Sequence, residues 1–143
     1  MTTIVKKKRK RKTGLNVKAK KKRAAARAVV KKGSGKIKVN KRDLGLFEPR
    51  YLKEFIEEPL HILPDVAKEA DIKVNVKGGG FMSQASATRS AIAKSLVLYS
   101  KDAKAKQAML AYDRLLLVDD VRRVESKKPL GTKARKKKQK SKR

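Results

Sequence analysis

The sequence has no cysteine and no tryptophan, one histidine, and only three phenylalanines and three tyrosines among 143 residues. Without cysteine the chain cannot form disulfides, zinc–thiolate sites or a catalytic thiol, and this composition fits a reducing compartment. No apolar run approaches the roughly twenty residues that span a bilayer, so we expect no membrane partner. The charged start is not followed by a hydrophobic stretch, so we expect no secretory signal.

Acidic residues are absent from both ends of the chain. The whole chain has 42 Lys and Arg, 13 Asp and Glu and a formal net charge of +29. Twelve of the Lys and Arg lie in residues 1–23 and ten lie in residues 126–143. The last eighteen residues have only Leu130 and Ala134 as apolar side chains, so they cannot form a core. Such a segment orders only against a strongly negative partner. Both ends therefore predict binding to nucleic-acid phosphates.

The middle of the chain is balanced enough to fold. Residues 24–125 hold 20 basic and all 13 acidic residues, and they suffice for one domain with a modest core. We predict three parts: a basic arm over residues 1–23, a globular domain over 24–125 and an extended basic tail over 126–143.

Alternating and helical patterns predict an α+β fold. Apolar residues alternate with polar ones, mostly lysines, in 35–40 and 72–77, which predicts strands, and a turn at Gly33–Gly35 predicts a hairpin of 24–32 with 35–40. Helical spacing predicts a helix over 48–58 that stops at Pro59, a short turn over 66–70, a helix over 83–99, and a last helix that begins after Asp102 and continues through Leu116. Because each strand has one apolar face, helices must cover that face in a two-layer sandwich.

Two features of the predicted domain are open to more than one interpretation. The polar sheet face presents Lys36, Lys38, Lys73 and Lys77, either as a solvated surface or as a surface that faces RNA. Gly78–Gly80 is either a tight strand-to-helix turn or a loop that binds a phosphate of the RNA backbone.

The residues that could carry chemistry lack partners. His61 is the only histidine, and Ser83 and Ser86 have no base near them in the sequence. The adjacent acids Glu57–Glu58 are expected on a helix surface, and Asp120 is expected to pair with Arg122 or Arg123. We therefore expect no enzyme, no metal, no cofactor and no small-molecule substrate.

Three other interpretations share part of the pattern. A histone-like DNA-binding protein would have similar arms but needs a dimer core and a groove-reading helix, whereas the helix predicted over 83–99 is alanine-rich and poorly charged. A phosphotransfer enzyme could use Gly78–Gly80, but no Walker lysine follows and no acidic magnesium ligand is nearby. The run Lys6–Lys12 is either a nuclear localisation signal or a solvated or RNA-bound arm. The arms contain no aromatic residue, so base stacking on their side chains is excluded.

Three blocks of the sequence carry a family resemblance. They are GSGKIKVNKR (Gly33–Arg42), GGGFMSQASATRSAIAKSL (Gly78–Leu96) and DVRRVESKKPLGTKARKKKQKSKR (Asp120–Arg143). In their order and spacing these blocks resemble the universal small-subunit ribosomal protein nine family, and the resemblance covers essentially residues 20–143. The ending Ser141-Lys142-Arg143 is highly specific to that family. The resemblance implies a mixed four-stranded sheet with helices on one face, like the second domain of small-subunit protein five.

The resemblance also implies a place and partners. It implies a structural protein of the head of the small ribosomal subunit, in a cytoplasmic or organellar ribosome. The implied partners are small-subunit ribosomal RNA, the transfer RNA in the peptidyl site and neighbouring head proteins. The tail would thread through ribosomal RNA toward the decoding centre, and there the chain's last three residues would meet the transfer RNA: Ser141, Lys142 and Arg143.

The expected ribosomal RNA contacts lie in three regions. The sheet face supplies the first two, the glycine loop and its helix supply the next five, and the tail with the residues just before it supplies the rest. They are Lys36, Lys38, Gly78, Gly79, Gly80, Gln84, Arg89, Arg122, Arg123, Lys127, Lys128, Lys133, Arg135, Lys136, Lys137, Lys138 and Lys140.

Overall fold

The computed structural model of the chain describes residues 14–129 and 131–135. Two short 3₁₀ helices, η1 and η2, accompany the strands and α-helices, whose order along the chain is β1 (Leu15–Lys21), β2 (Ala24–Lys32), β3 (Ile37–Val39), β4 (Arg42–Asp43), η1 (Leu44–Leu46), α1 (Arg50–Ile62), α2 (Pro64–Glu69), β5 (Ala70–Lys77), α3 (Phe81–Ser100), α4 (Ala103–Tyr112) and η2 (Arg114–Leu116).

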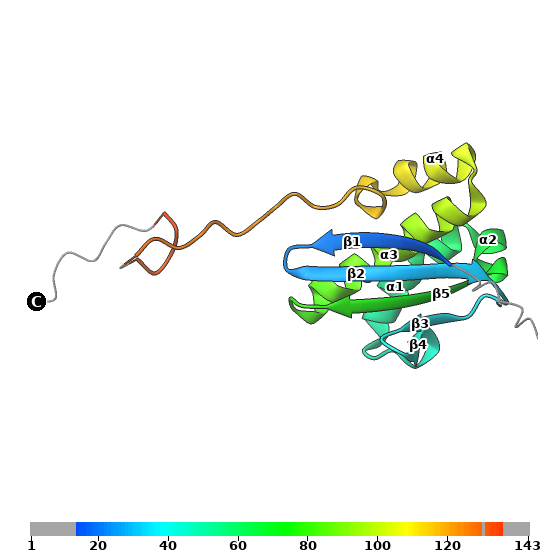
Figure 1. Cartoon of the computed structure of the whole chain (residues 1–143), viewed down its shortest axis with the longest axis horizontal. Helices are drawn as coiled ribbons and strands as arrows, with labels where there is room; N and C mark the ends of the chain where they lie inside the picture. Colours follow the sequence, from blue (N-terminus) through cyan, green and yellow to red (C-terminus); the bar gives the residue numbers. More distant parts are fainter. Residues whose placement is uncertain (1–13, 130, 136–143) are drawn as a thin grey trace, which may run out of the picture.

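The strands form one mixed five-stranded sheet in the order β1-β2-β5-β3-β4. The β3 and β5 strands run parallel, whereas the pairs β1–β2, β2–β5 and β3–β4 are antiparallel. In Figure 1 the strands lie in front, with α1 and α3 behind them. The predicted α+β sandwich with one covered face is confirmed, but the sheet has five strands rather than four.

Small side chains let the long helix α3 lie close to the sheet. This helix packs on β1, β2, β5 and α1. The contacting surfaces are rich in buried alanine, including Ala19, Ala24, Ala26, Ala28, Ala85, Ala87, Ala91 and Ala93. Larger side chains fill the space around them, and Ile56, Ile72, Ile92, Leu96, Met109 and Leu116 are fully buried. Such burial of apolar surface is the main driving force for this fold.

The first strand lies in a segment that the sequence places in the basic arm. Residues 15–21 form β1, which pairs along its length with β2. Ala19 is fully buried and Val17 is half-buried, while Lys18 and Lys20 on either side of Ala19 are exposed. The lysine-rich composition concealed this alternation, so the arm prediction is wrong for residues 15–21.

The predicted hairpin of 24–32 with 35–40 is also wrong. The turn at Gly33–Gly35 instead carries the chain past the start of β5, and β3 pairs with the far side of β5. The Asp71 carboxylate fixes this crossing because it accepts hydrogen bonds from the backbone N–H groups of Ser34 and Lys36, each at 2.9 Å. These two bonds, that of Lys36 foremost, also lower the pKa of Asp71.

The helices agree with their predicted positions except near two ends. The α3 helix, β5 and the short α2 helix are confirmed, and the Asp102 side chain accepts from Lys104 N at 3.0 Å to cap α4. Pro59, predicted to stop α1, lies inside it and is buried. The last helix ends at Tyr112 instead of continuing through Leu116, since Asp113 starts η2 by accepting from Leu115 N at 2.8 Å.

Candidate nucleic-acid interface

The open face of the sheet carries rows of cations. Register places Lys18 beside Arg27 and Lys38 beside Lys73, and Lys20 and Lys77 flank Ala25 on β2. Beside them the surface is hollowed, with a lining of Ala25, Arg27, Asn40, Lys41, Asn75 and Lys77. Like charges on neighbouring strands repel one another, so an anionic partner would stabilise this face.

The two sheet lysines predicted to contact RNA differ in their surroundings. Lys36 is exposed just before β3, while Lys38 forms an ion pair with Asp43 at 3.3 Å. Arg27, Lys18, Lys20 and Lys41 are members of this surface that the sequence alone did not identify, because only the strand register assigns them to it.

The glycine loop between β5 and α3 has an open, positively polarised end. Gly78 and Gly79 adopt φ values of 79° and 70°, in the left-handed region that glycine tolerates best. A Cβ atom at Gly78 would lie 2.7 Å from the carbonyl oxygen of Arg23, whereas one at Gly80 would meet nothing within 4 Å. The α3 helix has no side-chain cap, and Gln84 Nε2 donates to the carbonyl of Gly78 at 3.2 Å. The free N–H groups of the first helical turn are a favourable position for a phosphate.

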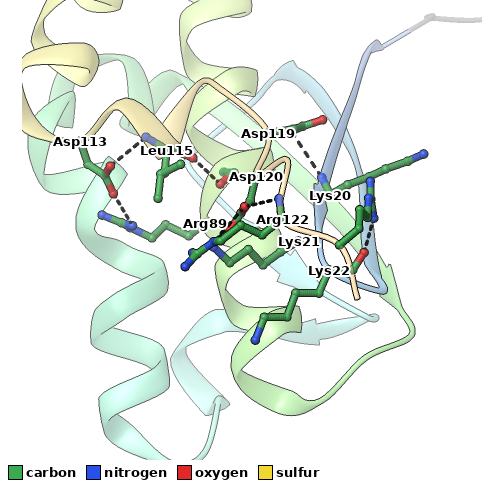
Figure 2. Close-up of polar contacts among 11 residues, drawn as sticks. Lys20, Lys21, Lys22, Arg89, Asp113, Leu115, Asp119, Asp120 and Arg122 are labelled. Atoms are coloured by element: carbon green, nitrogen blue, oxygen red, sulfur yellow. Dashed lines mark hydrogen bonds and ion pairs between the residues drawn. The ribbon is translucent and has the colours of Figure 1, made fainter. Parts of the chain in front are cut away.

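The tail is attached to the domain by a polar cluster on the outer edge of β1 (Figure 2). Asp120 is only 8% exposed, and it accepts hydrogen bonds from the Arg122 guanidinium at 2.8–3.1 Å and from Arg122 N at 2.8 Å. It also forms an ion pair with Lys21 of β1. The Arg122 side chain, followed by Lys21 and the Arg122 backbone N–H, holds the pKa of Asp120 far below its usual range. The predicted pairing of Asp120 with Arg122 is confirmed.

Neighbouring residues extend this attachment along β1. Asp119 accepts a hydrogen bond from Lys94 of α3 at 2.5 Å and a long one from Lys20 N at 3.4 Å. Arg123 donates to the carbonyl of Lys22. We call residues 119–123 the tail root. It covers part of the free edge of β1 and joins the edge strand, α3 and the tail, so the tail leaves the domain from a fixed position.

Beyond the tail root the chain extends away from the domain, past the β1–β2 turn (Figure 1). Lys127, Lys128, Lys133 and Arg135 are all exposed. Arg135 binds Glu125 with hydrogen bonds of 2.6 and 3.0 Å. This pair lowers the pKa of Glu125 and raises that of Arg135. Both side chains are more than half exposed, so the pair is weak and RNA phosphates can compete for Arg135.

Several predicted contact residues lie outside the described residues. They are the tail lysines Lys136, Lys137, Lys138 and Lys140 and the three predicted transfer-RNA contacts Ser141, Lys142 and Arg143.

Arg89 does not lie on a surface that RNA can contact. It is 8% exposed, and its guanidinium lies 2.9 Å from Asp113 and 2.5 Å from Glu58, over the ring of Phe55 at 4.6 Å. Its assignment as an RNA contact is therefore corrected to a structural role that joins α1, α3 and η2. The sequence held a signal for this, because Arg89 lies on the same helical stripe as Ala85 and Ile92. Glu58, expected on a helix surface, is half-buried and pairs with Arg89.

Neither a cluster of metal-ligating side chains nor a candidate membrane-spanning helix occurs in the part of the chain that the structure describes. Over residues 14–129 and 131–135, no group of three or more His, Asp and Glu side chains could hold a metal ion. Within the same residues no helix has the length and apolar character needed to cross a membrane.

These features define a small, basic α+β protein with a cationic sheet face and a cationic tail fixed at its root. Residues 19–143 match the family described as Ribosomal protein S9/S16. The chain belongs to this family, so it is a structural ribosomal protein that serves translation and is not an enzyme. The predicted resemblance is confirmed, and the histone-like and phosphotransfer interpretations are set aside.

Curated relatives agree with this membership. The chain is 50% identical over 118 residues to the small ribosomal subunit protein uS9 of Picrophilus torridus, an alignment that covers 82% of this chain and 89% of that protein. It is 48% identical over 118 residues to uS9 of Thermoplasma acidophilum, covering 82% and 92%, and 45% identical over 106 residues to uS9 of Methanococcus maripaludis, covering 74% and 79%.

Proposed function

We propose that the chain is a structural component of the small ribosomal subunit head. It binds small-subunit ribosomal RNA through its open sheet face, its glycine loop and its tail. The end of the tail, Ser141–Arg143, reaches the transfer RNA in the peptidyl site, and the domain lies against neighbouring small-subunit proteins.

The observation that carries this proposal is the joining of two cationic surfaces at an anchored tail root. The rows of Lys and Arg on the sheet face and the lysines beyond Glu125 both suit a polyanion. Because Asp119 and Asp120 attach the tail to α3 and β1, a domain docked on RNA also determines where the tail starts. Phosphate contacts of this kind position a protein without reading sequence.

The length of the tail and its chemistry fit the second part of the proposal. Eighteen extended residues span up to about 60 Å, which is enough to connect a domain on the RNA surface with a distant functional centre. The planar guanidinium of Arg143 can bind two phosphate oxygens and keeps its charge at any physiological pH.

Removal of Ser141–Arg143 tests the transfer-RNA contact. We expect subunits that contain the shortened chain to assemble and sediment normally, since the three residues removed are all polar and cannot form part of an apolar core. We expect their affinity for peptidyl-site transfer RNA in a filter-binding assay to fall. A chain of full length with Lys142→Gln and Arg143→Gln separates the loss of charge from the loss of length. Unchanged binding by both variants would refute the contact.

A further inference from the structure

Aromatic side chains are scarce in this chain, yet they gather at one place on its surface. Three of the six, Phe47, Tyr51 and Phe81, line a hollow of about 320 Å³ between the start of α1 and the start of α3. Tyr51 is 54% exposed and Phe81 is 64% exposed, so their rings are accessible to a partner. The volume lies at the lower end of the range for small-molecule pockets, about 300–1,000 Å³.

The floor of this hollow holds a polar group that the domain does not satisfy. Thr88 lines the hollow and is 1% exposed, and its hydroxyl has no hydrogen-bond partner among the described residues. Buried hydroxyls are rarely left unpaired. The Glu48 carboxylate lies at the same hollow and can accept a hydrogen bond from an amino group. The hollow thus has apolar walls and a few polar groups, as a site for a flat heteroaromatic ring requires.

An anion site adjoins the hollow. Phe81 is the first residue of α3, directly after Gly78–Gly80, so the uncapped first turn of this helix lies at the rim. Lys77 precedes the loop and is exposed. A glycine turn leads from β5 directly into α3, and the N-terminus of a helix entered in this way can bind a phosphate.

The rim is held in place before any ligand arrives. The Asn40 side chain accepts from Val76 N at 2.9 Å and donates to Val76 O at 3.2 Å. Gln84 fixes the glycine loop by its bond to Gly78 O. A preorganised rim lowers the entropic cost of binding.

We propose that this hollow binds one unpaired nucleotide of ribosomal RNA, with the base against Phe81 and Tyr51 and its phosphate at the start of α3. The inference rests on the proposed function and adds base recognition to it. An apolar side chain from a neighbouring protein would fit the walls, but it would leave the Thr88 hydroxyl unpaired and the helix N-terminus without an anion. The base satisfies the first once a small shift of the walls uncovers the Thr88 hydroxyl, which has almost no accessible surface, and its phosphate satisfies the second.

Chemical probing of bases in reconstituted small subunits tests the proposal. We compare wild-type protein with Phe81→Ala, with Thr88→Val and with Leu98→Ala, a control on α3 that also removes an exposed apolar side chain (Leu98 is 42% exposed). For Phe81→Ala we expect one unpaired nucleotide to become about five-fold or more reactive, the lower end of what the loss of one stacked base produces. Thr88→Val should raise the reactivity of the same nucleotide by less, and Leu98→Ala should leave it unchanged.

The outcomes separate this proposal from the function on which it rests. If wild-type protein does not enter small subunits, the proposed function fails. If all proteins enter but no nucleotide responds to Phe81→Ala, or if Leu98→Ala produces the same response, the nucleotide site is wrong. Ultraviolet cross-linking of wild-type subunits gives a second measurement: a nucleotide attached to Phe81 or Tyr51 supports the site, and attachment to another protein overturns it.

Discussion

The two faces of the domain differ in how their cations are balanced. On the helix side, acidic residues accompany the basic ones, with Glu54, Glu57 and Glu58 on α1 and Asp65 and Glu69 on α2. On the open sheet side, Arg27, Lys73 and Lys77 have no carboxylate within ion-pair distance among the described residues. A buried, paired cation such as Arg89 helps to hold the domain together, whereas the unpaired cations of the sheet face are available to an external anion.

Arg89 and Arg27 show the difference within one residue type. Arg89 lies in the interior between two carboxylates, whereas Arg27 is exposed on β2 and lines the hollow of the sheet face. The same guanidinium therefore serves packing in one place and recognition in the other. The tail root combines both uses, since Asp120 binds Arg122 while the Arg122 side chain stays 73% exposed.

Neutralising the described tail cations should have the largest effect. The variant Lys127→Gln, Lys128→Gln, Lys133→Gln, Arg135→Gln removes four charges that release counterions on binding. We expect the slope of log affinity for RNA against log salt to fall by about three, at about 0.7–0.9 per phosphate contact. Filter binding across a salt series measures this slope, and the urea midpoint should not change. An unaltered slope would show that the tail does not contact phosphates.

Replacing Arg89 should destabilise the domain. Arg89→Met leaves Glu58 and Asp113 without their shared cation, and breaking such a pair costs about 3 kcal/mol, the low end for buried pairs because both carboxylates are 28% exposed. Urea unfolding measures the change in the free energy of unfolding.

Arg27→Met is the matched control for that experiment. It should leave the unfolding free energy within about 0.5 kcal/mol of wild type, as is usual for surface substitutions, and reduce the salt slope of RNA binding. If the two variants exchanged these effects, the distinction between paired and unpaired cations would be wrong.

A single change at the end of the chain should have a smaller effect on transfer-RNA binding. Arg143→Ala removes a charge-assisted contact, and we expect a loss of about 1–3 kcal/mol in the binding free energy of peptidyl-site transfer RNA. Filter binding to assembled subunits measures the loss. Equal affinity for wild type and variant would assign the contact to Lys142.

The tail root should contribute a pH-dependent part of the stability. The pKa of Asp120 is lower in the folded protein than in the unfolded chain, so its stabilisation is complete above the unfolded pKa of about 3.9 and is lost as the pH falls through the folded pKa. Asp120→Asn should therefore lower the urea midpoint at pH 7, and this difference should shrink as the pH falls below about 4. A difference that grows in acid would contradict the sign of the shift. Asp43→Asn, whose partner pair is exposed, is the control.

Local patterns made much of the fold predictable. The alternation of 72–77, the helical spacing of 83–99 and the capping residue Asp102 each report on one element, and all three elements are present. The β1 strand escaped prediction because lysines outnumber its inward-facing Val17 and Ala19. The pairing of β3 with β5 depends on Asp71, 35 residues from Lys36, and such non-local contacts leave no periodic signal.

The site was less predictable than the fold. The cationic tail and the glycine loop follow from composition, whereas the membership of the sheet face requires the register of the strands. Arg89 was misassigned because its charge suggests the surface, although its position on the stripe with Ala85 and Ile92 places it inside. The hollow between Tyr51 and Phe81 arises only when two helix starts meet at the end of the sheet.

Lysine modification in free protein and in assembled small subunits tests the central claim most directly. The claim is that the sheet face and the tail bind RNA and that α4, on the helix side, does not. We predict that Lys18, Lys73, Lys77 and Lys127 react in the free protein and become protected in the subunit, while Lys104 and Lys106 on α4 keep more of their reactivity. Equal protection of both sets, or sheet-face lysines that stay as reactive as in the free protein, would contradict it.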